Sequence, residues 1–463
     1  MPTEKSILAD MSVPLATTAL LTDMYELTMI ESALKSGTAW RASVFELFAR
    51  RLPGSRRYGV VAGTGRAIEA VQNFHFGPEE INYLREAHVV GEETLDFLAN
   101  FKFTGDIYGY LEGECYFPNS PLMTVIGPFA QTVLLETVLL SILNYDSAVA
   151  TAASRMTIAA HDRPCLDMGS RRTHEMSAIA AARASVIGGF VGTSNLEAAR
   201  LYGIKPIGTA AHSFTLVHDS EEEAFRAQIA TMGTGTTLLV DTYDVHRGVE
   251  LAVKVAREAG GELGAVRIDS GDLVAQAFNV RAQLDELGAT STKITVTSDL
   301  DEYAIAALNA APVDSYGVGT KLVTGSGRPT AEMVYKLVER EGSDGQMHEV
   351  AKKSAEKNSV GGLKVAGRTH DETGRAAKEI IVSAASWEQG LEYLEARGAR
   401  PLQVKLVDHG VADPQYFDDG ALARAAERHR NARAALPYAA WRLSEGDPGL
   451  PTEMVDIFED DDV

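Results

Sequence analysis

The residues best suited to chemistry lie in one short stretch, residues 205–215, which reads KPIGTAAHSFT. Gly208, Thr209 and two alanines precede His212, and these small residues would leave its imidazole accessible at the mouth of a predicted strand. A histidine ring changes charge near neutral pH, and its nitrogen can act as a nucleophile or accept a phosphoryl group. A single histidine is more often a hydrogen-bonded core residue, so its interpretation depends on the residues around it.

Polar residues follow seven short apolar runs, which alternate with segments of helical periodicity between residues 165 and 321. The polar ends are residues 168–172, 192–195, 208–212, 241–244, 269–272, 298–299 and 319–321. Strands that alternate with helices predict a parallel, barrel-like sheet, and reactive residues in such barrels gather where the strands end. We therefore expect the seven polar groups to share one rim.

Cations and glycines on this rim are suited to binding anions. Arg171 follows Gly169 and Ser170, and Arg267 stands two residues before Asp269. Guanidinium groups match the geometry of carboxylates and phosphates. The stretch 317–320, GVGT, adds exposed backbone N–H groups that can hold phosphate oxygens where a helix begins.

Carboxylates supply the opposite charge on the same rim. They are Asp241, Asp244, Asp269, Asp272 and Asp299. Hard oxygen ligands beside bound phosphates are what Mg²⁺ prefers, and carboxylates can also stabilise positive charge on a sugar carbon. Each aspartate alone is equally suited to capping a helix. The whole set predicts a site for a phosphorylated sugar and an anionic co-substrate.

Composition limits the remaining classes of function. The 463 residues include 43 Lys and Arg against 64 Asp and Glu, a net charge of −21, which argues against binding to nucleic acid or to an anionic membrane. The two cysteines form no zinc or redox motif, and the start has no secretory pattern, so we expect a cytoplasmic protein. The most apolar segment, 129–145, is interrupted by polar residues and predicts a buried helix.

The pattern divides the chain into three parts. Residues 1–127 predict a mixed α/β domain, with a helix from about residue 22 and strands near 43–48, 101–111 and 114–126. Residues 128–340 predict an irregular α/β barrel that carries the active site. Residues 341–463 predict a C-terminal segment that partly rejoins the first domain through 380–382 and 402–407, a closing helix at 421–435 and an acidic tail. A basic run there is interpreted as a solvated face; it comprises Lys352, Lys353, Lys357, Lys364 and Arg368.

Five of these stretches together resemble the nicotinate phosphoribosyltransferase family. They are residues 22–29 (TDMYELTM), 169–172 (GSRR), 208–213 (GTAAHS), 267–272 (RIDSGD) and 317–320 (GVGT), in the order of the family. The resemblance implies a TIM-like irregular α/β barrel beside an α/β domain made from both chain ends. It also implies a homodimer in which Tyr25 reaches the barrel of the partner subunit.

The implied reaction joins nicotinate and phosphoribosyl pyrophosphate into nicotinate mononucleotide and pyrophosphate, with Mg²⁺ and coupled hydrolysis of ATP, as an entry to NAD salvage. By position, His212 would be phosphorylated transiently by ATP. Tyr25 would stack on the pyridine ring, and Arg267 and Thr209 would hold the nicotinate carboxylate.

The resemblance assigns the phosphoribosyl group to other residues of the rim. Gly319 and Thr320 would hold the 5-phosphate, and Arg171 would neutralise phosphate charge. Asp269 and Asp299 would hold ribose hydroxyls or the waters of the metal. No residue is assigned as a direct protein ligand of the metal.

Two positions separate this chain from the related nicotinamide enzymes. Those enzymes have an aromatic residue where this chain has Met168, and an aspartate near Ser194 that accepts from the amide. A thioether can still pack against a ring. An acid beside Ser194 would repel a carboxylate, so its absence from Thr193-Ser194-Asn195 favours nicotinate.

Four alternatives stay open from the sequence. Two are sister activities, the nicotinamide enzyme and the decarboxylating quinolinate enzyme, of which the second would need more cations and no phosphorylatable histidine. A third is a barrel aldolase, which needs a Schiff-base lysine inside a strand. The fourth is a regulatory or scaffold protein that carries a phosphohistidine, which leaves Arg267 and the GVGT stretch unexplained.

Overall fold

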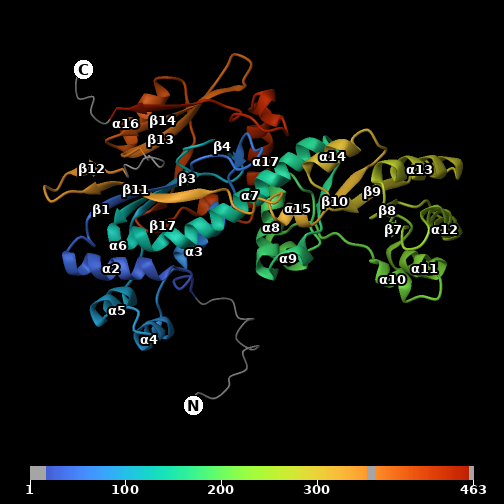
Figure 1. Ribbon diagram of the computed structural model, residues 1–463, viewed down its shortest axis with the longest axis horizontal. Coiled ribbons are helices and arrows are strands. Elements are labelled where there is room, and N and C mark those ends of the chain that lie inside the picture. The colour runs from blue at the N-terminus through green and yellow to red at the C-terminus, as the bar shows by residue number, and fades with distance from the viewer. Residues whose placement is uncertain (1–16, 352–359, 458–463) are drawn as a thin grey trace.

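The computed structural model describes residues 17–351 and 360–457. Along its longest axis, a unit rich in antiparallel strands lies beside a second unit with a parallel sheet (Figure 1). The first unit contains both early and late parts of the chain, and the second contains the middle part. This arrangement confirms the mixed α/β class.

A seven-stranded antiparallel sheet forms the centre of the first unit, in the order β12-β11-β1-β5-β3-β16-β17. Its strands are β1 (Ala42–Ala49), β3 (Asp106–Tyr110), β5 (Met123–Pro128), β11 (Met333–Glu341), β12 (Met347–Glu349), β16 (Gln403–Asp408) and β17 (Val411–Ala412). β16 pairs with β3, so this late segment lies among N-terminal strands. The predicted boundary at residue 340 falls inside β11, and this strand belongs with the first unit because it pairs with β1.

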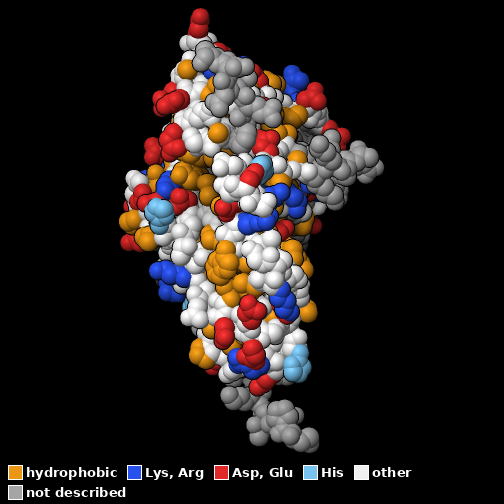
Figure 2. Space-filling view, turned by 90° about the vertical axis from the view of Figure 1, so that its left-hand side faces the viewer, with side chains coloured by type: hydrophobic (Ala, Val, Ile, Leu, Met, Phe, Trp, Pro, Cys, Tyr) orange, Lys and Arg blue, Asp and Glu red, His pale blue; other side chains and the backbone are white. Residues whose placement is uncertain are grey.

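Short helices accompany this sheet, and they are α2 (Met24–Ser36), α3 (Thr64–Gln72), α4 (Pro78–Glu86) and α5 (Glu92–Ala99). The strand expected at 114–126 is divided into β4 (Cys115–Tyr116) and β5, because Pro118 and Pro121 cannot donate to a strand ladder. On the end of the molecule formed by this unit, charges of both signs surround a group of hydrophobic side chains (Figure 2).

A four-stranded sheet covers the first unit, in the order β15-β13-β14-β18. Its elements are β13 (Leu363–His370), β14 (Ala376–Ala384), β15 (Arg400–Pro401), β18 (Thr452–Asp456) and the helix α16 (Trp387–Glu395). Residues 380–382 therefore lie in this smaller sheet and not in the seven-stranded one.

Two cations of the basic run are buried between the two sheets, so a solvated face was the wrong interpretation for them. The Arg368 guanidinium donates to Glu114 at 2.7 Å and to Glu379 at 2.8 Å. Lys364 donates to Glu46 at 3.0 Å. These partners come from distant strands, so the sequence pattern gave no sign of the pairing. Lys352, Lys353 and Lys357 lie outside the described residues.

A long helical segment connects the two units, as the sequence predicted. It consists of α6 (Phe129–Thr132), η1 (Val133–Leu135) and α7 (Glu136–Ala160). By length and composition it could cross a membrane, but 61% of its most apolar window is buried inside the protein. The helix is therefore the apolar core element shared by both units.

The second unit contains a five-stranded parallel sheet in the order β6-β10-β9-β8-β7. Its strands are β6 (Cys165–Asp167), β7 (Thr237–Leu239), β8 (Ala265–Ile268), β9 (Lys293–Ser298) and β10 (Ser315–Val318). The two further strands expected at 188–195 and 205–209 are reduced to single parallel bridges, from Asp167 to Thr193 and from Thr193 to Pro206. Among the described residues, no strand pairing closes the sheet between Pro206 and β7.

Helices follow the strands of this sheet and lie around it (Figure 1). They are α8 (Glu175–Ile187), α9 (Leu196–Tyr202), α11 (Glu221–Met232), α12 (Val245–Glu258), α13 (Leu273–Glu286) and α14 (Glu302–Leu308), and α17 (Ala421–Ala435) packs against α8. The parallel register brings the carboxyl ends of all five strands to one edge, as the alternating pattern predicted.

Replacing Arg368 with methionine tests the ionic contact between the two sheets. The change leaves Glu114 and Glu379 buried without their shared cation, so we expect a loss of about 3–5 kcal/mol in the free energy of unfolding. Urea denaturation followed by circular dichroism measures it.

Lys378→Met is the matched control, because the Lys378 pair with Glu453 lies on the surface of the adjacent strand. We expect a change below about 1 kcal/mol for this control. Equal losses for the two variants would contradict a stabilising role for the buried network.

Candidate active site

His212 is the first residue of α10 (His212–Leu216), on the edge where the parallel strands end. Its Nδ1 lies 3.1 Å from the Thr242 hydroxyl. Its Nε2 lies 3.9 Å from a carboxylate oxygen of Asp241 and 3.9 Å from one of Asp269. The His212 side chain is 40% exposed. The imidazole is thus held at one nitrogen, while the other faces two acids and solvent.

Asp241 connects the ends of two neighbouring strands. Its Oδ2 accepts the backbone N–H of Asp269 at 2.9 Å and the hydroxyl of Ser270 at 2.7 Å. The side chain is only 1% exposed, and Oδ1 has no hydrogen-bond partner among the described residues. A buried carboxylate oxygen without a donor favours a cation or a protonated group nearby.

Arg267 holds the loop that leads to His212. One Nη donates to the carbonyl oxygen of Ala210 at 3.0 Å, which joins residues 208–212 to β8. Burial lowers the pKa of Arg267, the nearby Asp269 and Asp241 oppose this shift, and the charge of Arg171 adds to it. Arg171 and Arg267 therefore influence one another on the same edge, as the sequence analysis expected of its two arginine sites.

The other predicted acids divide into two groups. Asp269 accepts the Thr297 hydroxyl and faces His212, and Asp299 is exposed at the end of β9. Asp244 and Asp272 instead accept the backbone N–H groups of Arg247 and Ala275, so they cap α12 and α13. Their structural roles match the alternative that the sequence left open for each aspartate.

The end of β6 is shaped by Asp167, a residue to which sequence reasoning assigned no role. Its carboxylate accepts the N–H of Gly169 at 2.8 Å and the Thr193 hydroxyl at 2.6 Å. A Cβ on Gly169 would lie 2.3 Å from a Val323 methyl, so only glycine fits this turn. The turn leaves Arg171 and Ser194 exposed on the edge. Asp167 is the polar residue that ends an apolar strand, and this position is the sequence signal that could have identified it.

Gly319 and Thr320 lie at the end of β10, where α15 (Thr320–Val323) begins. A Cβ on Gly317 would lie 2.6 Å from the Met168 sulfur, so this side chain packs against the strand end. Thr209 is exposed in the loop before His212. With these residues, the edge contains every predicted site residue of the barrel segment.

Tyr25 is separated from this group within one chain. It belongs to α2, in the first unit, whereas His212 begins α10 in the second (Figure 1). Its side chain is 45% exposed. Burial of the hydroxyl, together with Glu136 and other acids, raises the pKa of Tyr25 to about 12.

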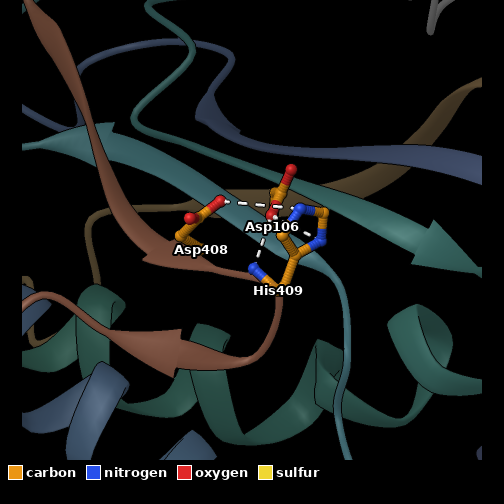
Figure 3. A group of neighbouring side chains, drawn as sticks. All are labelled: Asp106, Asp408 and His409. Atoms are coloured by element: carbon orange, nitrogen blue, oxygen red, sulfur yellow. Dashed lines mark hydrogen bonds and ion pairs between the residues drawn. The ribbon is translucent and has the colours of Figure 1, made fainter.

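A separate cluster of potential ligand groups lies in the first unit. Asp106, Asp408 and His409 come together where β3 and β16 pair (Figure 3). Lys405 contacts both carboxylates, 3.2 Å from Asp106, and the backbone N–H of His409 donates to Asp106 at 2.8 Å. The lysine charge offsets part of the negative charge of this group, to which the sequence pattern gave no pointer.

Two family models match the chain. The nicotinate phosphoribosyltransferase N-terminal domain matches residues 20–144, and the nicotinate phosphoribosyltransferase family model matches residues 164–379. Nicotinate phosphoribosyltransferase pncB1 of Mycobacterium tuberculosis is 50% identical over 444 residues, which cover 94% of this chain and 95% of that one. The chain belongs to the nicotinate phosphoribosyltransferase family. The Bacillus subtilis nicotinate phosphoribosyltransferase is 40% identical over 348 residues, covering 74% of this chain and 71% of that protein.

Solved structures agree with this family in fold. The crystal structure of human nicotinic acid phosphoribosyltransferase matches with a TM-score of 0.77 and 24% identity, over 94% of this chain and 97% of that one. A nicotinate-nucleotide pyrophosphorylase from Pyrococcus furiosus matches with a TM-score of 0.74 and 22% identity, over 91% and 97%. Every motif on which the resemblance was based falls within the two matched segments.

Replacing Asp167 with alanine tests how this family member shapes its β6 turn. The change leaves the buried Gly169 N–H and Thr193 hydroxyl without their acceptor, and we expect a loss of about 1–3 kcal/mol in unfolding free energy. Hydrogen exchange should show faster exchange at residues 168–172.

The exposed Asp299→Ala variant is the control, with an expected change within about 0.5 kcal/mol. Asp167→Asn should lie between the two, since the amide keeps one acceptor. If Asp167→Ala exchanged like the wild type at residues 168–172, the carboxylate would not hold the turn.

Proposed function

We propose that this chain joins nicotinate and phosphoribosyl pyrophosphate into nicotinate mononucleotide and pyrophosphate, and that ATP hydrolysis is coupled through a transient phosphohistidine at His212. Family membership supports the transferase reaction. The observation that carries the coupling is the partly exposed side chain of His212, whose Nε2 faces Asp241 and Asp269 on the strand-end edge.

The nicotinate carboxylate would lie against Arg267, with the Thr209 hydroxyl beside it. Arg267 is half-buried, and its Nε has no hydrogen-bond partner among the described residues. An unpartnered guanidinium N–H suits a carboxylate ligand. Ser194, in place of an acid, adds no negative charge there, which favours nicotinate over nicotinamide.

The phosphoribosyl group would lie nearer β10. The N–H groups of Gly319 and Thr320 would hold the 5-phosphate at the start of α15, and Arg171 would neutralise phosphate charge. Asp269 and Asp299 would accept hydrogen bonds from the ribose hydroxyls or from waters of Mg²⁺. We infer these roles from the family resemblance and from the position of the residues at the ends of the parallel strands.

The carboxylates on this edge fit Mg²⁺. The free Oδ1 of Asp241 and the outward oxygen of Asp269 are hard ligands that a hydrated magnesium ion prefers. Bound Mg²⁺ would neutralise the charge of pyrophosphate as it leaves. Without such a cation, the two acids would repel the phosphates of both co-substrates.

The transfer itself needs little acid or base help. The pyridine nitrogen uses its lone pair to form a bond to the anomeric carbon, while the bond from this carbon to the pyrophosphate oxygen breaks. The ribose would gain positive charge as this bond breaks, and Asp269 would stabilise that charge. Orientation by Arg267 and the phosphate site would supply most of the rate enhancement.

His212 would react through Nε2. If Nδ1 donates its proton to the Thr242 hydroxyl, Nε2 carries the lone pair that attacks the γ-phosphorus of ATP, and the bond to ADP breaks. Hydrolysis of the phosphohistidine would then return the free imidazole. The added phosphate charge would order the 208–212 loop, which Arg267 already contacts.

The assembly and setting are part of the same proposal. A homodimer would bring Tyr25 of the partner subunit to the pyridine ring, since in its own chain Tyr25 belongs to α2 of the first unit and the edge belongs to the second (Figure 1). The product would enter NAD salvage in the cytoplasm. An aldolase is less well supported, because the only lysine in β6–β10, Lys293, is paired with Asp314 on the surface.

A product assay tests the transfer reaction directly. Purified protein with Mg²⁺ and phosphoribosyl pyrophosphate receives nicotinate, nicotinamide or quinolinate, each with and without ATP. We expect nicotinate mononucleotide to form fastest and ATP to increase its rate. Preferred turnover of nicotinamide would mean that the roles of Arg267 and Ser194 are misassigned.

Replacing His212 with alanine tests the coupling. We expect the stimulation by ATP to disappear while slower, ATP-independent product formation remains, because the transfer chemistry does not use the imidazole. With γ-labelled ATP, the wild type should carry acid-labile phosphate and the variant should carry none. Full stimulation by ATP in the variant would refute the phosphohistidine.

A further inference from the structure

Glu26 is a fully buried acid at the start of α2, outside the edge that contains His212. Its Oε1 accepts the backbone N–H of Thr137 at 3.1 Å and the Thr137 hydroxyl at 2.5 Å. Its Oε2 accepts the Thr22 hydroxyl, and the residue has no exposed surface. The Oε1 contacts therefore connect the first turn of α2 with the first turn of α7, and the Oε2 contact holds Thr22 against the start of α2.

The helix N–H groups around Glu26 favour a carboxylate, whereas burial disfavours its charged form. The N-termini of two helices converge on it, and each leaves N–H groups that need acceptors. Burial nevertheless raises the pKa of Glu26 to about 7, and the hydrogen bonds from Thr137 and Thr22 oppose that shift. The contact is a specific junction between helices and not a solvated surface charge.

The neighbouring Tyr25 is held by the same junction. Its hydroxyl lies near Thr137 and Glu136, at the start of α7, and these groups influence the pKa of the phenol. Its side chain remains 45% exposed. Thr137 is thus shared, because Glu26 fixes its N–H and hydroxyl while Tyr25 approaches the same side chain. The junction lies directly beside the tyrosine, and much of the side chain stays accessible.

We propose that Glu26 is a positioning residue, which locks the first turn of α2 onto α7 and thereby holds the exposed ring of Tyr25 in the orientation that receives the pyridine substrate. This inference rests on the proposed function, in which Tyr25 stacks on nicotinate. Glu26 lies one residue from Tyr25, is buried and acts only through Thr137 and Thr22. A ring held in place before binding loses less conformational entropy when the ligand arrives.

The distinguishing feature of this role is which kinetic constant changes. Loss of ring orientation weakens binding of nicotinate, so we expect Glu26→Ala to raise KM for nicotinate by about fivefold, with kcat within about twofold. KM for phosphoribosyl pyrophosphate should stay unchanged. Glu26→Gln keeps an amide oxygen for the Thr137 N–H and should restore KM to near the wild-type value.

The experiment is steady-state kinetics on the full-length protein with a double-mutant cycle. The variants are Glu26→Ala, Glu26→Gln, Tyr25→Ala and the Glu26→Ala/Tyr25→Ala double variant. If Glu26 acts through the ring, Glu26→Ala should add almost nothing to KM in the Tyr25→Ala background. Glu31→Ala is the control, since this half-buried acid of the same helix pairs with Lys35 and accepts the Gly91 N–H, away from Thr137, and it should leave KM unchanged.

Other outcomes overturn the inference and separate it from the proposed function. An equal rise in KM with and without Tyr25, or a fall in kcat and thermal midpoint at constant KM, would make Glu26 a purely structural acid. Unchanged KM in Tyr25→Ala would remove the stacking role, and this inference with it. A wild type without transferase activity would refute the proposed function itself.

A second variant covers the case in which Glu26→Ala does not fold. Thr137→Val removes the hydroxyl that donates to Glu26 and lies near Tyr25, while the backbone N–H remains available to Glu26. We expect the same rise in KM for nicotinate at constant kcat. An unchanged KM in folded Thr137→Val would overturn the inference.

Discussion

The buried carboxylate of Asp241 accepts hydrogen bonds from the backbone of Asp269 and from the Ser270 hydroxyl, and these bonds fix the end of β8 to the end of β7. Its second oxygen faces His212. A charge in this position needs a compensating cation, and Arg267 and the proposed Mg²⁺ would supply it. This contact fixes Asp269 directly, and Thr242 and Arg267 hold His212 and the 208–212 loop beside it.

A second group of buried charges joins early and late segments of the chain. Arg368 from β13 lies between Glu114 and Glu379, and Arg400 also contacts Glu114. Removing one partner would leave an uncompensated charge in the interior, so the acids and the cations must be present together. This network holds the smaller sheet on the first unit.

Much of the edge could be predicted because its signals are local. Short apolar runs followed by polar residues identified the parallel strands, and the rule that such strands share one edge brought His212, Arg267 and Asp269 together before any contact was known. The same local reasoning could not separate Asp244 and Asp272, which cap helices, from Asp241, which shapes the site. All three follow strands, and only their acceptor geometry differs.

The sequence by itself determined the α/β class, the long central helix, the strand-end edge and the family, because periodicity and short motifs depend on residues close together in the chain. Only the tertiary structure decided that Lys364 and Arg368 are buried, that two expected strands become single bridges and that Glu26 connects α2 to α7. Those features depend on partners that lie tens to hundreds of residues away. Burial and hydrogen bonding across such distances leave no periodic signal in the sequence.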